Sequence, residues 1–414
     1  MVKWNFKPSK HLMECHDMLG VRGILQDIKA QLDPNGKTPI PIGHGDPAAF
    51  QCFRIPPEAE AALHQTIASG KFNTYSSPEG LLQARRAVSN HLSQGLPYDL
   101  SVDDIYLTCG SAQAIDIAIS VLASKGANIL LPRPSYPQYE ALLAYYSIEH
   151  RFYDLVPERG WEINVDQLHA IADKNTIAMI IINPNNPCGS VYTSEHLLMV
   201  AQTAKHLGFL IIADEVYGDI VFNDAKFFPM RNFASTVPVI TIGSISKKYA
   251  VPGWRVGWLV TCDPHGVLKA SQVTGAIRKL VNFVTDPATI IQAAIPAIIE
   301  NTPDQFHMQM LQYFSEAADI LYDSIQNISF LHCPSKPRGA MFSMIKIDFS
   351  GFLDLQDDVE FALKLAKEES VVVLPGTPLA MKNWIRVTFG VPPKLLKEAL
   401  ERMEAFCRRH YRSL

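Results

Sequence analysis

The feature of this sequence that most constrains the fold is an alternation of short apolar runs with longer amphipathic segments, from about residue 75 to residue 285. This alternation indicates repeated βαβ units, which build a mostly parallel sheet with helices on its faces. The predicted strands are residues 105–108, 128–131, 178–182, 210–213, 239–242 and 256–260. The predicted helices between them are residues 112–122, 136–145, 165–171 and 194–206.

After residue 287 the pattern changes to long helices followed by further strands. We predict helices over residues 290–300, 303–326 and 394–410, and strands over residues 341–347, 371–374 and 385–388. This mixture is typical of a smaller α+β domain beside the large α/β domain. The predicted parts are an N-terminal segment that packs on the small domain or on a partner, a large domain and a small domain, over residues 1–60, 61–300 and 301–414.

Composition excludes several classes of protein. The net charge is only −4, which gives no basic surface for nucleic acid or for a membrane. Seven cysteines are scattered singly without a C-x-x-C pair, which argues against a disulfide framework and a zinc site. No apolar run has the length of a signal peptide or of a membrane span. We therefore expect a cytoplasmic protein without a metal, whose partners are small molecules or another copy of the chain.

The segment S-I-S-K-K-Y-A-V-P-G-W-R, residues 244–255, follows a predicted strand and gathers a lysine, two hydroxyl groups and an arginine. A lysine amine condenses with an aldehyde to form a Schiff base, while hydroxyl and guanidinium groups bind phosphate. The segment therefore predicts a site for pyridoxal 5′-phosphate, with Ser244, Ser246 and Arg255 at its phosphate. A solvated turn is the competing interpretation of a lysine pair beside serines.

Ligands of a parallel sheet bind beyond the carboxyl ends of the strands, so the residues that follow the other predicted strands are further candidates. After residues 105–108, Gly110 leads into a helix whose first residues, Ser111, Ala112 and Gln113, present N–H groups to a phosphate. The same residues also fit an ordinary βα turn.

Two more strand ends carry polar groups. In N-P-N-N-P-C-G, residues 183–189, the prolines fix a tight loop and Asn186 fits the phenolate oxygen O3′ of the cofactor, although a plain turn is the alternative. In D-E-V-Y-G, residues 214–218, Asp214 fits the cationic ring nitrogen of the cofactor, because a buried carboxylate needs a partner, and Tyr217 fits O3′. An acid that caps the next helix is the alternative for Asp214.

Taken in this order, the four segments resemble the class I/II aminotransferases of fold type I, which depend on pyridoxal 5′-phosphate, and most closely the tyrosine aminotransferase-like proteins of plants. The resemblance covers nearly the whole chain and includes G-H-G-D-P, V-P-G-W-R-V-G-W and N-W-I-R, residues 43–47, 251–258 and 383–386. It implies that Lys247, eight residues before Arg255, forms the Schiff base. Lys248 and Arg338 depart from the usual pattern, and these departures are expected to bear on substrate preference and not on cofactor binding.

The resemblance also assigns residues outside the four segments. It implies that Tyr136 stacks on the cofactor ring, although core packing is the alternative for an aromatic residue at a helix start. It implies that Tyr75 reaches the phosphate of the neighbouring subunit in a homodimer. Arg386 is expected to hold the substrate α-carboxylate in a bidentate pair, with Gly45 and Asn186 beside it.

The activity implied by the resemblance is transamination, in which Lys247 moves a proton at the substrate Cα and a 2-oxo acid such as 2-oxoglutarate accepts the amino group. The apolar residues 280–284 lack an arginine, which favours tyrosine, phenylalanine or another large hydrophobic donor, and hence aromatic amino acid metabolism. A carbon–sulfur lyase of the S-alkylthiohydroximate lyase kind is the alternative, and residues 339–342 and 383–386 favour the aminotransferase. A non-catalytic binding protein is a further alternative. A dehydrogenase is disfavoured, because no G-x-G-x-x-G motif follows any predicted strand of this sequence.

Overall fold

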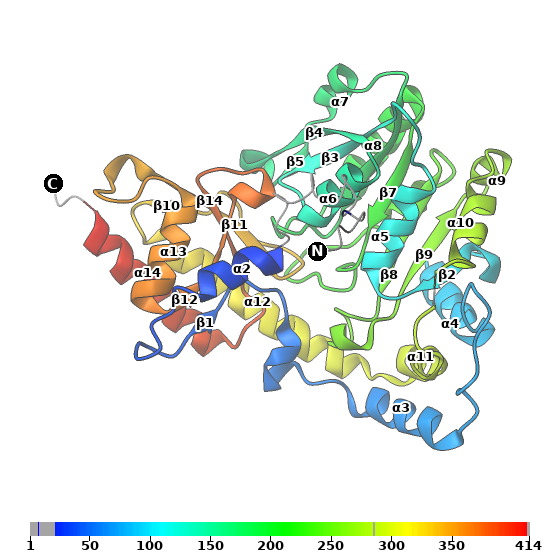
Figure 1. Cartoon of the computed structure of the whole chain (residues 1–414), viewed down its shortest axis with the longest axis horizontal. Helices are drawn as coiled ribbons and strands as arrows, with labels where there is room; N and C mark the ends of the chain where they lie inside the picture. Colours follow the sequence, from blue (N-terminus) through cyan, green and yellow to red (C-terminus); the bar gives the residue numbers. More distant parts are fainter. Residues whose placement is uncertain (1–6, 8–20, 285, 412–414) are drawn as a thin grey trace, which may run out of the picture.

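The structure is a computed structural model that describes residues 7, 21–284 and 286–411, so most of the first 20 residues of the predicted N-terminal segment lie outside the described residues. Figure 1 shows a large unit around a central sheet and a smaller unit that ends with helix α14 (Pro393–His410). The two units correspond to the predicted large and small domains. The exact boundaries after residues 60 and 300 stay predictions.

The central sheet has eight strands in the order β2-β9-β8-β7-β6-β3-β4-β5. Strands β8, β7, β6, β3 and β4 are parallel neighbours, while β9 is antiparallel to β2 and β8, and β5 is antiparallel to β4. This topology confirms the predicted α/β class with a mostly parallel sheet. The strands are β2 (Ile105–Thr108), β3 (Asn128–Arg133), β4 (Glu149–Val156), β5 (Glu162–Ile163), β6 (Thr176–Ile182), β7 (Leu210–Asp214), β8 (Val239–Ser244) and β9 (Gly257–Cys262).

Helices bury both faces of this sheet. In β6, Ile180 and Ile182 belong to a hydrophobic cluster that includes helices α5, α6 and α10, whereas Met179 and Ile181 belong to a second cluster with α4, α8 and α11. Burial on both faces explains why the inner strands read as continuous apolar runs. The helices of this unit are α3 (Pro57–Ser69), α4 (Leu82–Ser93), α5 (Ser111–Ser120), α6 (Pro137–Tyr145), α7 (Val165–Ile171), α8 (Ser194–Leu207), α9 (Val267–Ala270), α10 (Val273–Val281) and α11 (Thr289–Asn301).

The smaller unit contains an antiparallel sheet in the order β10-β11-β14-β13. A separate parallel pair, β1 (Ile40–Pro41) with β12 (Val371–Val372), ties the N-terminal segment to this unit. Helix α12 (Asp304–Gln326) packs on α14 and β10. The remaining elements are α2 (Val21–Lys29), β10 (Leu331–His332), β11 (Phe342–Ile347), α13 (Asp358–Glu369), β13 (Leu374–Pro375) and β14 (Trp384–Thr388).

The predicted secondary structure is wrong in one element and incomplete in others. The single strand over residues 371–374 is two short strands, and the prediction omitted strands β1, β4, β5 and β10 and helices α2, α3, α4, α9, α10 and α13. Most side chains of strand β4 are only partly buried and several are charged, so the strand lacks the apolar run of its neighbours. Helix α13 does carry a start signal, because the Asp357 side chain accepts hydrogen bonds from the N–H groups of Val359 and Glu360. No helix among the described residues is long and apolar enough to cross a bilayer.

Candidate active site

The candidate site lies at the edge of the central sheet where β2, β6, β7 and β8 end. Strands β6, β7 and β8 are parallel neighbours, and β2 runs in the same direction as β8 because two antiparallel pairings separate them. The residues that follow these four strands therefore meet at one edge of the sheet. The four segments predicted from the sequence are thus brought together.

Lys247 is partly buried at this edge. Its Nζ donates a hydrogen bond to the carbonyl oxygen of Gly45 at 3.1 Å and lies 5.7 Å from the centroid of the Tyr217 ring. Burial lowers the pKa of Lys247 to about 8, and the charges of Arg386 and Arg255 act in the same direction. A lowered pKa enlarges the neutral fraction of the amine, which is the form that attacks an aldehyde or accepts a proton.

Asp214 is buried at the end of β7. The Tyr139 hydroxyl donates a hydrogen bond to Oδ2 at 2.7 Å, and the Val216 N–H donates to Oδ1 at 3.2 Å. Burial raises the pKa of Asp214 to about 6, while these two hydrogen bonds lower it. Because both donors are neutral, the carboxylate suits an added cation such as a protonated pyridine nitrogen.

Aromatic rings border the space beside the lysine. Tyr217 is buried and packs edge-on against Phe342, with ring centroids 5.9 Å apart. Tyr136 lies at the N-cap of α6 and packs edge-on against Tyr139 at 6.4 Å. Burial raises the pKa of both Tyr136 and Tyr217, so each hydroxyl stays protonated and can donate a hydrogen bond.

The start of α5 and Arg255 form a cradle suited to a phosphate. Among the described side chains, none caps helix α5 at its N-cap residue Gly110, which leaves helix N–H groups to an anion. The Nη2 atom of Arg255 donates to the carbonyl oxygen of Cys109 at 3.3 Å. A Cβ added at Gly110, where φ is +74°, would lie 2.4 Å from that nitrogen, so glycine allows the guanidinium to approach the turn.

The remaining predicted phosphate residues adjoin this cradle. Ser111 and Ala112 begin helix α5, whereas the Gln113 Oε1 accepts a hydrogen bond from the Cys109 N–H at 2.6 Å, so its side chain is engaged in the turn. Ser244 and Ser246 are both buried, and the Ser244 hydroxyl accepts from the Ser246 N–H at 3.3 Å. Their roles toward a phosphate stay predictions.

Arg386 is buried in the middle of β14 and lies on the substrate side of the lysine. Its Nη1 donates to the Asn186 Oδ1 at 3.1 Å, its Nη2 donates to the carbonyl oxygen of Gly43 at 2.9 Å, and its Cζ lies 4.3 Å from the Phe342 ring centroid. The buried Nε has no hydrogen-bond partner among the described residues. Burial lowers the pKa of Arg386 to about 10, as expected of an enclosed guanidinium that a carboxylate would stabilise.

Gly45 lies between this substrate side and the lysine. A Cβ added at Gly45 would lie 2.3 Å from the Phe342 ring, so a larger residue would collide with the aromatic wall. Of the loop asparagines, only Asn186 contacts Arg386. Asn185 holds the turn itself, by donating to the Ile182 carbonyl at 3.2 Å and accepting from the Cys188 N–H at 3.0 Å.

Two predicted positions lie outside this constellation. Tyr75 is 99% exposed, so in a single chain it does not join the site. Arg338, which departs from the family pattern, donates to the exposed Asp224 at 3.3 Å on the surface. The effect of Arg338 on substrate preference stays a prediction.

Sequence reasoning missed Tyr139 and Phe342. The signal for Tyr139 was its spacing of three residues from Tyr136, which places both side chains on one face of a helix. Phe342 had no comparable signal, because it becomes a wall of the site only when β11 pairs with β14 and its ring meets Arg386.

The arrangement offers an amine of lowered pKa, a buried carboxylate, an anion cradle and a buried guanidinium with a free N–H. These groups fit a phosphorylated pyridine aldehyde on one side of Lys247 and an amino acid carboxylate on the other. Among residues 7, 21–284 and 286–411, no cluster of three or more His, Cys, Asp or Glu side chains could hold a metal ion.

Comparisons with known proteins agree with this chemistry. The family model "Aminotransferase class I and II" matches residues 37–403. Nicotianamine aminotransferase 1 of Oryza sativa subsp. japonica is 49% identical over 395 residues, which cover 95% of this chain and 80% of that protein. S-alkyl-thiohydroximate lyase SUR1 of Arabidopsis thaliana is 46% identical over 374 residues, which cover 90% of this chain and 81% of the lyase. The solved structure of tyrosine aminotransferase from Leishmania infantum has a TM-score of 0.91 at 29% identity and covers 99% of this chain and 100% of that one.

Proposed function

The chain belongs to the class I and II aminotransferase family, whose members depend on pyridoxal 5′-phosphate, and we propose that its amino donor is tyrosine, phenylalanine or another large hydrophobic amino acid. The proposed acceptor is a 2-oxo acid such as 2-oxoglutarate. The chain is an enzyme rather than a non-catalytic binding protein, because the family consists of enzymes. The placement of Arg386 in an aromatic setting beside Lys247 carries the proposal.

The aromatic setting supports a hydrophobic donor. The rings of Phe342, Tyr217 and Tyr136 border the space between Arg386 and the cofactor residues, and aromatic side chains pack favourably on such rings. No arginine occurs in residues 280–284, which favours a donor side chain without a carboxylate.

Each residue at the site has a proposed task in the reaction. When bound, pyridoxal 5′-phosphate supplies an aldehyde for an amine and a ring that withdraws electrons from the substrate Cα. Lys247 holds or moves the proton at Cα, and Asp214 keeps the ring nitrogen protonated. Arg255 and the start of α5 anchor the phosphate, while Arg386 and Asn186 orient the α-carboxylate.

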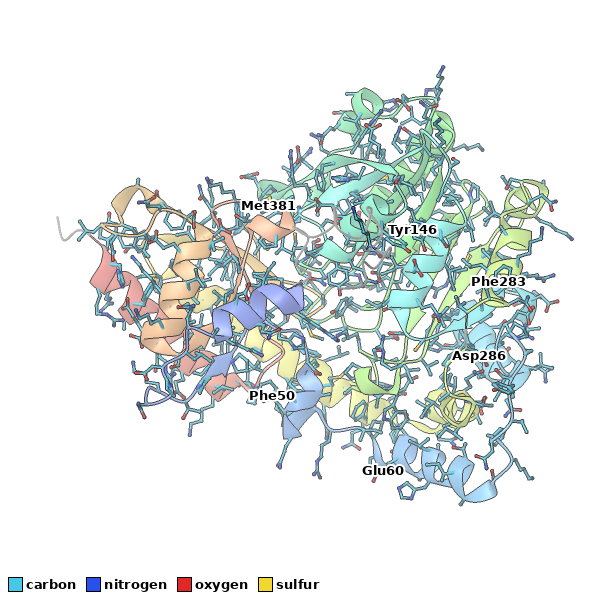
Figure 2. The ribbon with its side chains drawn as sticks, viewed as in Figure 1. Phe50, Glu60, Tyr146, Phe283, Asp286 and Met381 are labelled. Carbon is cyan, nitrogen blue, oxygen red and sulfur yellow. The ribbon has the colours of Figure 1, made fainter. Side chains whose placement is uncertain are left out.

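A homodimer is part of the proposal, because Tyr75, the residue expected to serve a neighbour, is exposed. Tyr75 is 99% exposed, and the aromatic residue Phe283 is 83% exposed and lies at the periphery near α10 in Figure 2. The loops that carry them are tied together, since Ser76 donates to Asp286 and the Gln292 Nε2 donates to the Ser76 hydroxyl at 3.2 Å. We propose that Tyr75 reaches the phosphate of the neighbouring subunit. Sedimentation of the wild type should show a dimer.

The experiment that tests the donor is a panel of amino acids on the purified enzyme with 2-oxoglutarate. Tyrosine and phenylalanine should give the highest initial rates, with methionine lower and aspartate lowest. Nicotianamine belongs in the panel because a relative named for it is 49% identical. A higher rate with nicotianamine than with tyrosine would replace the proposed donor.

The lyase is the second candidate, and the 46% identity to a protein named as an S-alkyl-thiohydroximate lyase favours it. A lyase releases a thiol and needs no 2-oxo acid, so thiol production without 2-oxoglutarate separates the two activities.

The proposed compartment is the cytoplasm, which imaging of a tagged chain tests.

A further inference from the structure

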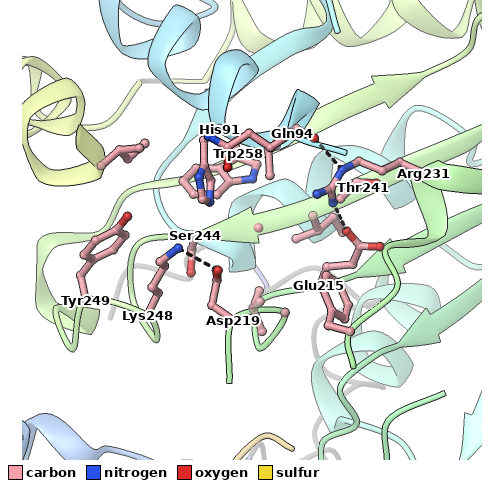
Figure 3. Close-up of a pocket in the computed structure, with 17 residues that line it drawn as sticks. His91, Gln94, Glu215, Asp219, Arg231, Thr241, Ser244, Lys248, Tyr249 and Trp258 are labelled. Carbon is pink, nitrogen blue, oxygen red and sulfur yellow. Dashed lines mark hydrogen bonds and ion pairs between the residues drawn. The ribbon is translucent and has the colours of Figure 1, made fainter. Parts of the chain in front are cut away.

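The two segments that follow β7 and β8 carry side chains at the candidate site and also side chains that line a cavity. Asp214 accepts the hydrogen bond of Tyr139 at the candidate site, whereas Glu215 and Asp219 line a cavity of about 190 Å³ that Ser244, a predicted phosphate residue, also borders. The two lysines differ in the same respect, because Lys247 belongs to the site and Lys248 lines the cavity. Figure 3 shows Lys248 and Asp219 pointing toward one another among the residues that line this cavity.

Lys248 and Asp219 form an ion pair that joins the two segments. Their Nζ and Oδ1 atoms are 2.7 Å apart, and the Lys248 side chain is only 15% exposed. The Tyr249 ring lies 5.7 Å from the ammonium, and His307 of α12 packs on that ring at 5.4 Å. The Lys248 ammonium is mostly enclosed while the Asp219 side chain is 48% exposed, and the pairing offsets the cost of enclosing the ammonium.

The other charged groups of the cavity do not compete for Lys248. Glu215 is engaged by Arg231, with 2.6 Å between Oε2 and Nη1, and both side chains are buried. Burial lowers the pKa of His91 and lowers that of His307 to about 4, so both are neutral near pH 7. The charge of Lys248 is therefore balanced by Asp219.

We propose that the Lys248–Asp219 ion pair positions Lys247, by tying the segment that carries this amine to the segment that carries Asp214. The inference rests on the proposed role of Lys247 in transamination. Loss of Asp219 would leave an enclosed ammonium without a partner, so Lys248 would turn toward solvent and shift its neighbour Lys247. A displacement of about 1 Å in a reacting group costs up to about a hundredfold in rate.

The test compares Asp219→Asn, Lys248→Arg and the double variant Lys248→Met/Asp219→Asn with the wild type. Asp219→Asn should lower kcat about tenfold with the KM of the amino donor nearly unchanged, because the amine is misplaced and substrate binding is not. In the cofactor-free protein, hydrogen exchange in peptides covering residues 244–256 should accelerate about tenfold. Lys248→Arg should keep both values near those of the wild type, and the double variant should recover part of the loss because no charge is left unpaired.

The chain offers a matched control in Asp319→Asn, which breaks an exposed pair of the same kind, with 2.8 Å between the Lys336 Nζ and the Asp319 Oδ1. This control should change neither kcat nor exchange in residues 244–256. The proposal is overturned if Asp219→Asn behaves like Asp319→Asn, or if it lowers only the melting temperature. If Asp219→Asn does not fold, failure of the double variant to differ from Lys248→Arg overturns it. Hydrogen exchange is measured without substrate, so it tests whether the Lys248–Asp219 ion pair holds residues 244–256 even if the proposed amino donor is wrong.

Discussion

The cofactor side and the substrate side of this site are built in different ways. On the cofactor side, Asp214 and Lys247 follow strands of the large parallel sheet, where backbone pairing on both sides fixes the strand ends. On the substrate side, Arg386 lies within β14 of the small sheet and meets the rest of the site through Asn186 and Gly43. We therefore expect changes on the cofactor side to lower the rate of the chemical step, and changes on the substrate side to weaken binding of the amino donor.

The largest expected effect is that of Lys247→Ala, which removes the cofactor side's amine. Turnover should fall at least about a thousandfold, because proton transfer by a positioned group alone contributes roughly 10²–10⁴-fold. The cofactor should still bind in part through the cradle at Arg255 and α5. Stopped-flow rates of the half-reaction and equilibrium dialysis of the cofactor measure the two effects, and a variant with full activity would refute the role of Lys247. Lys336→Ala, at an exposed position, is the control.

Arg386→Lys probes the substrate side, because it keeps the charge and removes the planar fork. We expect kcat/KM for the amino donor to fall about a hundredfold, mostly through KM, while cofactor affinity stays unchanged. The matched control is Arg338→Lys, since Arg338 pairs with Asp224 on the surface. A weaker affinity for the cofactor in Arg386→Lys would mean that the two sides are not separable.

The contrast between the two sides also explains what could be predicted from the sequence. Asp214 and the lysine-bearing segment after β8 were predictable, because a polar group after an apolar run has a defined place in a parallel sheet. The choice of Lys247 over Lys248 came from the family resemblance. Arg386 was accessible only through the family resemblance, since its place depends on the pairing of β11 with β14. The opposite directions of Lys247 and Lys248 depend on the fold of the loop, which no local pattern encodes. Strand β4 was missed because its charged residues hide the apolar alternation.

Tyr139→Phe tests a single contact on the cofactor side, because it removes one hydrogen bond to Asp214. We expect kcat to fall about tenfold, because a hydrogen bond to a charged group contributes roughly 1.5–3 kcal/mol. The pKa of Asp214 should rise further, since the Tyr139 hydroxyl now lowers it. Tyr146→Phe is the matched control, because the Tyr146 hydroxyl donates to Asp116 at 2.8 Å away from the strand ends. Equal rates for both variants in the half-reaction would exclude a role for Tyr139 in holding Asp214.

The smallest expected effect is on the stability of the cofactor-free protein, and it isolates the cost of burying Lys247. Its pKa falls from the ordinary 10.5 to about 8 in the folded chain, so the unfolded chain binds more protons between these values. Stability of the wild type should therefore rise as pH increases from about 8 to 10.5. Lys247→Met lacks this titration and should melt about 2–5 °C higher than the wild type at pH 7, and this difference in melting temperature should vanish near pH 10.5. For the control Lys336→Met, at an exposed lysine, the difference from the wild type should not shrink over this range. A constant difference in melting temperature between Lys247→Met and the wild type from pH 8 to pH 10.5 would contradict a lowered pKa of Lys247.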